Sequence, residues 1–168
     1  YRVKHVLPYR MRLPENSVDA ILSEHFLEHL IEPHVEKVLR DCYRVLKAGG
    51  RMRMAVPDFN HPLYEHMRVS QKDDDKNHKS IWTLDKLSRV IEAAGFDRIC
   101  PMHFWTHRGD ESGAGASYQF TERILDESHG IIKRTPKHDR RNKKNRQWGR
   151  LHKTSLVIDA IKIEGGNA

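Results

Sequence analysis

The polar run Ser23, Glu24 and His25 stands directly after the apolar stretch 18–22. Histidine titrates near neutral pH, so His25 is of a type that can take a proton from a substrate hydroxyl. Serine and glutamate offer hydrogen bonds to a polar ligand. An apolar strand that delivers such side chains at its carboxyl end is typical of the ligand-binding edge of an open α/β sheet. We therefore expect a binding site at this edge, with His25 as its candidate catalytic residue.

A second polar run follows a second strand pattern. Large apolar residues alternate with arginine or alanine over residues 51–56, as they do in a strand whose two faces differ in burial. Asp58 and His61 come after this stretch. Because the carboxyl ends of parallel strands meet at one edge of a sheet, both side chains are candidates for contact with a substrate. Asp58 is also an ordinary turn former, and that structural alternative stays open.

A helix is expected between these two strands. Pro33 suits the first helical positions, because its missing N–H has no intrahelical partner there anyway. Gly49 and Gly50 should end the helix after Lys47, since glycine accepts the left-handed cap conformation. The apolar positions recur at three- and four-residue spacing: Val35, Val38, Leu39, Cys42, Val45 and Leu46. Strand, helix and strand then form a crossover that is almost always parallel and right-handed.

The later part of the chain predicts a second helix and two further strands. Residues 83–95 carry an apolar face at helical spacing, with Thr83 as the cap and Gly95 at the end. Residues 99–105 and 155–163 are apolar enough to form strands. Strands that alternate with helices predict an α/β sheet.

Four segments of the chain, in this order and spacing, resemble the middle of class I S-adenosylmethionine-dependent methyltransferases, in particular the UbiE-like or type 11 group. They are Leu13–Asp19, Ser23–Leu30, Tyr43–Gly50 and Ala55–Asp58. The resemblance is close up to about residue 60 and looser beyond it. It implies a Rossmann-like, mostly parallel α/β sheet with an antiparallel last strand, and a single, partial methyltransferase domain over residues 1–168.

The same resemblance implies S-adenosylmethionine as the cofactor and a small-molecule acceptor such as a sugar, a quinone or a lipid. The positions that it assigns to cofactor binding are Val6, Leu7, Ser23, Glu24 and His25. It makes His25 the candidate catalytic residue as well. The candidate acceptor contacts are His29, Asp58, His61, Trp105 and Arg108. No metal is expected at this site.

The glycine-rich cofactor loop of the family has no counterpart in the chain. Family members open with a strand, this glycine-rich turn, a helix and a second strand. Here residues 2–7 already resemble the family's third strand, and Val6 stands where many members carry an aspartate near the adenine. We therefore expect a fragment whose sheet is completed by an upstream segment or a partner. A degenerate domain that binds no cofactor is the alternative.

His25, Glu28 and His29 also match the H-x-x-E-H pattern of inverted zinc peptidases. In that pattern two histidines one helical turn apart bind zinc, and the glutamate is the general base. The flanking residues favour the methyltransferase instead, because they fit its strand and helix on both sides. The triplet 73–75 of aspartates suggests Mg²⁺, but carboxylates flanked by lysines are typical of a solvated turn.

Positive charge is concentrated between Lys133 and Lys153. The chain has a net charge of +7, and this run alone holds ten Lys or Arg residues against the single Asp139. It lies in residues 106–154, which we expect to be a basic insertion before the last strand. With Trp148 inside it, the run favours RNA or DNA as an alternative partner or methylation substrate. An anionic small molecule and a solvated surface without a ligand are the other interpretations.

The composition bounds the class of protein. A chain of 168 residues is long enough for one domain with its own core. We find no apolar stretch long enough to span a membrane. Cys42 and Cys100 are spaced neither as a metal site nor as a disulfide framework, which is typical of a reducing compartment. We therefore expect a cytoplasmic protein.

Overall fold

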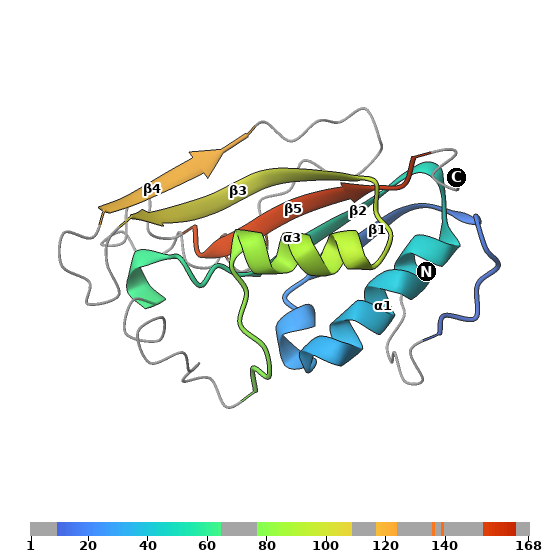
Figure 1. The fold of residues 1–168 in the computed structure, drawn as a ribbon, viewed down its shortest axis with the longest axis horizontal. Helices are drawn as coiled ribbons and strands as arrows, with labels where there is room; N and C mark the ends of the chain where they lie inside the picture. Colours follow the sequence, from blue (N-terminus) through green and yellow to red (C-terminus); the bar gives the residue numbers. More distant parts are fainter. Residues whose placement is uncertain are drawn as a thin grey trace.

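The computed structural model describes most of the chain, namely residues 10–64, 77–108, 117–123, 136, 139 and 153–163. Within these residues the chain forms one sheet of five strands with two helices packed on it (Figure 1). The strands are β1 (Val18–Glu24), β2 (Leu46–Pro57), β3 (Arg98–Arg108), β4 (Ser117–Glu122) and β5 (Ser155–Ile161). The helices are α1 (Glu32–Val45) and α3 (Leu84–Ala93), with short 3₁₀ turns η1 (Leu27–His29) and η2 (Pro62–Tyr64).

The strand order is β1-β2-β5-β3-β4. β1 and β2 are parallel, and α1 connects them as the predicted crossover. β5 lies between β2 and β3 and is antiparallel to both, while β3 and β4 form an antiparallel pair. The predicted α/β, Rossmann-like sheet with an antiparallel last strand is confirmed. Among the described residues the sheet is mixed and not mostly parallel, because β1 and β2 are its one parallel pair. β4 is an addition, because the sequence predicted no strand within residues 106–154.

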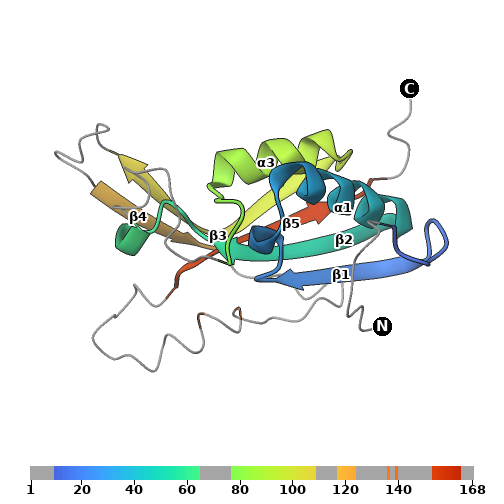
Figure 2. The ribbon, with the colours of Figure 1, turned by 90° about the horizontal axis from the view of Figure 1, so that it is seen from below.

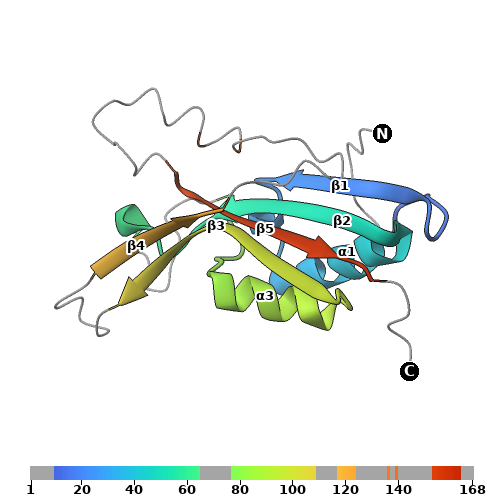
Figure 3. The same ribbon diagram turned by 90° about the horizontal axis from the view of Figure 1, so that it is seen from above.

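Both helices cover the same face of the sheet, as the two turned views show (Figures 2 and 3). The core lies between this face and the helices. From α1 it contains the predicted apolar positions Val35, Val38, Leu39 and Cys42, and from α3 Leu87, Ile91 and Ala94. Thr83 caps α3 as predicted, since its hydroxyl oxygen accepts the N–H of Lys86 at 3.3 Å. The amphipathic patterns therefore predicted correctly which faces are buried.

β2 is buried on both faces but with different chemistry. Met52, Met54 and Val56 face the helices and join the main core. The alternate residues Arg51 and Arg53 lie on the other face, where β5 contributes Asp159. The Arg53 guanidinium donates to both carboxylate oxygens of Asp159 at 2.7 Å, and Arg51 donates at 3.2 Å. We call these three residues the mid-sheet network.

The connection from α1 to β2 is tighter than the sequence predicted. The helix ends at Val45, two residues before the predicted end at Lys47, because Leu46 already has an extended conformation. Gly49 takes the left-handed conformation, with φ of +75°. A Cβ on Gly50 would stand 2.7 Å from the carbonyl oxygen of Lys47, so only glycine fits the close approach.

Candidate functional site

The predicted site residues cluster at the carboxyl ends of β1 and β2. His25 follows β1 with φ of +50°, an uncommon conformation for a residue other than glycine. Its N–H donates to the carbonyl of Ala55 on β2 at 2.8 Å, which fixes the sharp turn that leads into η1. The strained backbone is thus held by the neighbouring strand and aims the imidazole at the sheet edge.

Both ring nitrogens of His25 have protein partners. Nδ1 lies 3.2 Å from Oε1 of Glu28, whose side chain is buried. Nε2 lies 2.8 Å from Oγ of Ser155, the first residue of β5. Because β5 runs antiparallel to β2, its beginning reaches the same edge as the carboxyl end of β2. A buried carboxylate and a buried hydroxyl therefore hold the imidazole between them.

Asp139 continues this chain of contacts. One carboxylate oxygen accepts the Ser155 hydroxyl at 2.8 Å, together with the N–H and the hydroxyl of Thr154 at 3.0 and 3.2 Å. Burial raises the pKa of Asp139, although these hydrogen bonds and the nearby His25 oppose the rise. The residues Glu28, His25, Ser155 and Asp139 form one continuous row, which we call the edge relay.

Asp58 lies next to the edge relay at the end of β2. It is fully buried, its N–H donates to the Thr154 carbonyl at 2.9 Å, and its carboxylate accepts the N–H of Trp105 at 2.7 Å. A second carboxylate oxygen accepts the Asn60 N–H at 3.0 Å. Burial raises the pKa of Asp58 to about 7, and the charge of Asp139 adds to the rise. The contact with Asn60 confirms Asp58 as a turn former, and its contact with a substrate stays a prediction.

His61 and Trp105 pack against each other next to Asp58. Their ring centroids are 4.9 Å apart in an edge-on arrangement, and His61 is fully buried. The indole N–H of Trp105 donates to the carbonyl of Lys153 at 2.8 Å. Phe120 of β4 stacks on Trp105 at 5.1 Å, so the unexpected strand supports the predicted site residue. Asp58, His61 and Trp105 therefore form one packed group.

The remaining predicted residues lie at different places. Ser23 and Glu24 end β1, and Oγ of Ser23 is buried without a hydrogen-bond partner among the described residues. Arg108 ends β3 and is exposed. Its place is three residues beyond Trp105, about 10 Å along the strand. Val6 and Leu7 lie outside the described residues.

His29 stands on the far side of Glu28 from His25. Its Nδ1 is 3.0 Å from the carbonyl oxygen of Asn77, and its Nε2 is 4.0 Å from Glu28 Oε1. The geometry of an inverted zinc peptidase is not present. That site needs both histidines on one α-helix, whereas His25 has a left-handed backbone and precedes a 3₁₀ turn of three residues.

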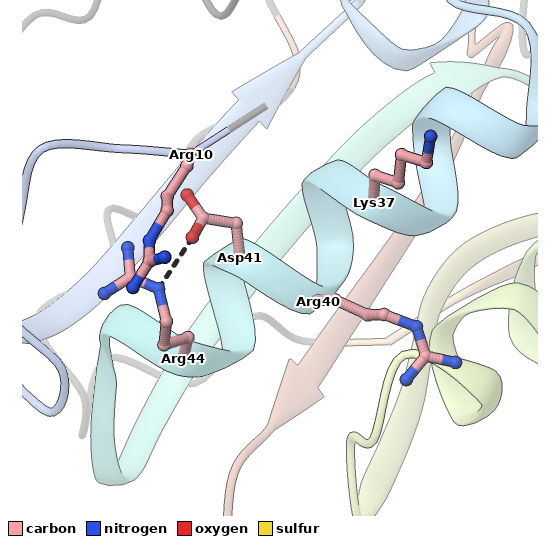
Figure 4. A pocket seen from close by; sticks show the side chains of 5 residues that line it. All are labelled: Arg10, Lys37, Arg40, Asp41 and Arg44. Carbon is pink, nitrogen blue, oxygen red and sulfur yellow. Dashed lines mark hydrogen bonds and ion pairs between the residues drawn. The ribbon is translucent and has the colours of Figure 1, made fainter. Parts of the chain in front are cut away.

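A separate charged hollow lies beside α1 (Figure 4). It is lined by Arg10, Lys37, Arg40, Asp41 and Arg44. Arg44 donates to the Asp41 carboxylate at 2.7 Å. It also donates to the carbonyls of Leu13 and Met11 at 2.9 and 3.0 Å. These contacts fasten the segment before β1 to the helix, so we assign the hollow a structural role.

Sequence reasoning missed two members of the edge relay. Ser155 matched only an apolar strand, and Asp139 only the lone acid of a basic run. The antiparallel direction of the last strand was the available signal for Ser155, because it brings the start of that strand to the carboxyl edge. No sequence signal placed Asp139, whose neighbours in the chain lie mostly outside the described residues.

Comparison with known proteins agrees with this fold. Residues 3–54 match a family model described as a methyltransferase domain. The chain superimposes on a SAM-dependent methyltransferase from Archaeoglobus fulgidus with a TM-score of 0.50 and 19% identity, covering 89% of this chain and 62% of that one. The fold is that of a class I methyltransferase. The predicted class is thereby confirmed at the level of the fold, and the UbiE-like subgroup stays a prediction.

Two further methyltransferase structures have the same fold. One is a possible histamine N-methyltransferase from Thermotoga maritima, with a TM-score of 0.53, 16% identity and coverage of 92% of this chain and 60% of that one. The other is the Haloferax volcanii complex between the Trm112 methyltransferase activator and a methyltransferase, with a TM-score of 0.51, 14% identity and coverage of 95% and 60%. The chain thus spans about 60% of these methyltransferases.

No curated protein matches the chain. Among the described residues, no helix is long and apolar enough to cross a membrane.

Proposed function

We propose that this chain is the acceptor-side part of an enzyme that transfers a methyl group from S-adenosylmethionine. The observation that carries the proposal is the edge relay. Its buried polar groups gather at the carboxyl ends of β1 and β2, on a sheet with the methyltransferase fold. In open α/β sheets this edge is the place where ligands bind. The proposed location is the cytoplasm.

The end of β1 offers groups that fit a cofactor. Ser23 Oγ is a buried hydroxyl without a partner among the described residues, so a ligand atom would satisfy it. Glu24 and His25 continue the same edge, and we propose all three as cofactor contacts, with Val6 and Leu7 on the adenine side. When bound, S-adenosylmethionine supplies an electrophilic methyl group on its sulfonium sulfur.

We propose His25 as the catalytic residue for an acceptor that must lose a proton. We propose that the Ser155 hydroxyl takes up the acceptor's proton as its own proton passes to Nε2. The ring then donates to Ser155, and the Ser155 hydroxyl donates to Asp139. Glu28 faces Nδ1 and stabilises the positive charge of the ring. The protonated imidazole therefore has a partner at each nitrogen. For acceptors without such a proton, holding donor and acceptor in line accounts for most of the rate.

The acceptor contacts divide by burial. His29 and Arg108 have exposed side chains and can contact a bound acceptor directly. Asp58 and His61 are fully buried: Asp58 accepts the backbone N–H of Trp105, and His61 packs edge-on against its indole. We propose that they position this indole as the inner wall. An aromatic wall with polar groups beside it suits a small organic acceptor such as a sugar, a quinone or a lipid.

The nucleic-acid alternative depends on the run from Lys133 to Lys153. Of that run the structure describes only residues 136, 139 and 153. Asp139 faces inward to Ser155 and Thr154 and belongs to the edge relay. The small-molecule acceptor is the proposal, because the described polar groups gather at the sheet edge, and RNA or DNA is the alternative.

A cofactor titration tests the proposal. S-adenosylmethionine is titrated by calorimetry into the protein, as the 168-residue chain and with any residues that precede Tyr1 in the natural protein. We expect one site per chain in at least one of these forms. His25→Gln should lower methyl transfer more than cofactor affinity, and Lys47→Ala at the opposite end of β2 should change neither. Absence of binding in both forms would overturn the proposal.

A further inference from the structure

Glu28 and His29, which the proposed function also uses, belong with His78 to a second group of polar side chains on the side of Glu28 away from His25. Among the described residues, Glu28, His29 and His78 offer ligand atoms that all lie within 4.8 Å of one another. The His29 and His78 rings are 5.2 Å apart. Two imidazoles and one carboxylate are a donor set that suits zinc.

The contacts of His29 identify which of its two ring nitrogens faces Glu28 without a proton. The carbonyl oxygen of Asn77 can only accept, so Nδ1 of His29, 3.0 Å away, carries the proton. In the neutral ring Nε2 is then a bare lone pair, and it faces Oε1 of Glu28 at 4.0 Å. Two acceptors that face each other have no hydrogen bond to make, whereas a cation between them satisfies both.

Glu28 supplies an independent observation. Its side chain is buried, and Oε2 has no hydrogen-bond partner among the described residues. A buried carboxylate oxygen without a partner costs folding free energy unless a ligand satisfies it. Oε1 also lies 3.2 Å from Nδ1 of His25, so the unpartnered Oε2 gives the carboxylate a second oxygen for an ion held against His29.

The surrounding chain holds the group in place. The N–H groups of Lys79 and Ser80 donate to the Glu28 carbonyl at 2.7 and 3.2 Å, which fixes the segment of His78 against η1. The Asn77 carbonyl orients His29 in the way that an outer partner orients a metal-bound histidine. The His29 side chain is 44% exposed, so an ion and a water ligand can enter from solvent.

We infer that Glu28, His29 and His78 form a zinc site that fastens residues 77–80 to η1 beside the proposed methyltransferase crevice. Tetrahedral zinc ligands stand about 3.4 Å apart. The ligand atoms of these three residues lie within 4.8 Å of one another, so they need to move only slightly closer to bind the ion. The site stands on its own geometry and does not depend on methyl transfer.

Zinc titration of the tag-free, chelator-treated full chain tests the site. Zn²⁺ is followed by calorimetry, and Co²⁺ by visible absorption, which reports tetrahedral nitrogen and oxygen ligands. We expect one ion per chain and a higher unfolding temperature with Zn²⁺. His78→Ala and Glu28→Gln should each weaken binding at least ~10-fold. The control is His34→Ala, which removes a histidine of α1 outside the group and should leave binding unchanged.

Two results would overturn the inference. One is a wild-type chain that binds no zinc. The other is binding that stays the same in His78→Ala and Glu28→Gln, because scattered surface histidines would then be the ligands. Circular dichroism of each variant without metal confirms that a loss of binding is not a loss of fold.

Discussion

Strand β5 carries two buried polar networks on the same face of the sheet, and they differ in how they balance charge. In the mid-sheet network, Asp159 lies between the guanidinium groups of Arg51 and Arg53. Four residues earlier, Ser155 enters the edge relay, where carboxylates gather around one histidine. The first network pairs opposite charges within the sheet. The second places carboxylates around a histidine at the edge where we propose that a ligand binds.

This difference distinguishes a network that stabilises the sheet from one that we propose serves ligand binding. In the mid-sheet network both oxygens of Asp159 are used by arginine. At the edge, Ser23 Oγ, Glu28 Oε2 and one oxygen of Asp139 are buried with no hydrogen-bond partner among the described residues. Burial also raises the pKa of Asp58 to about 7. Unpaired buried groups and shifted pKa values lower stability, so they are typical of sites that a ligand completes.

Removing the acid of the mid-sheet network should have the largest effect. Asp159→Ala leaves two buried guanidinium groups without their carboxylate, which should lower the free energy of unfolding by about 3–5 kcal/mol. Urea unfolding measures the change. Asp19→Ala is the matched control, because this exposed carboxylate pairs with Lys47 at 2.7 Å in solvent. Equal stability of the two variants would show that the network is not structural.

Asp58→Asn should flatten the dependence of stability on pH. The folded pKa of Asp58 is about 7 against an ordinary value of 3.8, so the folded chain binds the proton more tightly. The stabilisation from this group is complete below pH 3.8 and is lost as pH rises through 7. The loss is on the order of 4 kcal/mol.

Urea unfolding between pH 4 and 8 measures this slope in both proteins. The variant should lose less stability over the range than the wild type, although Asp139, with its raised pKa, keeps part of the slope. Parallel curves for variant and wild type would contradict the assignment of Asp58.

Ser155→Ala should have a smaller effect on stability and a clear effect on the site. It removes the hydroxyl that joins Nε2 of His25 to Asp139, at a cost of about 1–3 kcal/mol. Methyl transfer should fall with it, because the protonated imidazole loses a partner. Ser117→Ala on β4 is the control, since that serine is exposed. Unchanged turnover in Ser155→Ala would show that the edge relay takes no part in methyl transfer.

Local patterns in the sequence were enough to predict most of the fold. The helical spacing of Val35, Val38 and Leu39 and the alternation over residues 51–56 each identify a buried face. The parallel crossover follows from strand, helix and strand. β4 was not predicted, because it is identified by its pairing with β3 and its own sequence shows no strand pattern.

The sequence predicted site residues only at the ends of strands that it also predicted. His25 and Asp58 stand at such ends, and the structure brings them together through Thr154 and Ser155. The contact from His25 to Ser155 spans 130 residues, so only the strand order reveals it. Asp139 depends on tertiary contacts alone. The sequence therefore predicts which edge is used but not the groups that complete it.

A backbone amide spectrum recorded with S-adenosylhomocysteine tests the central claim most directly. The full chain, with any natural residues before Tyr1, is titrated with this unreactive form of the cofactor. The account predicts the largest shifts at residues 23–29 and at Asp58, with little change at Arg53 and Asp159 in the mid-sheet network. Shifts centred on the mid-sheet network, or none in either form of the chain, would contradict it.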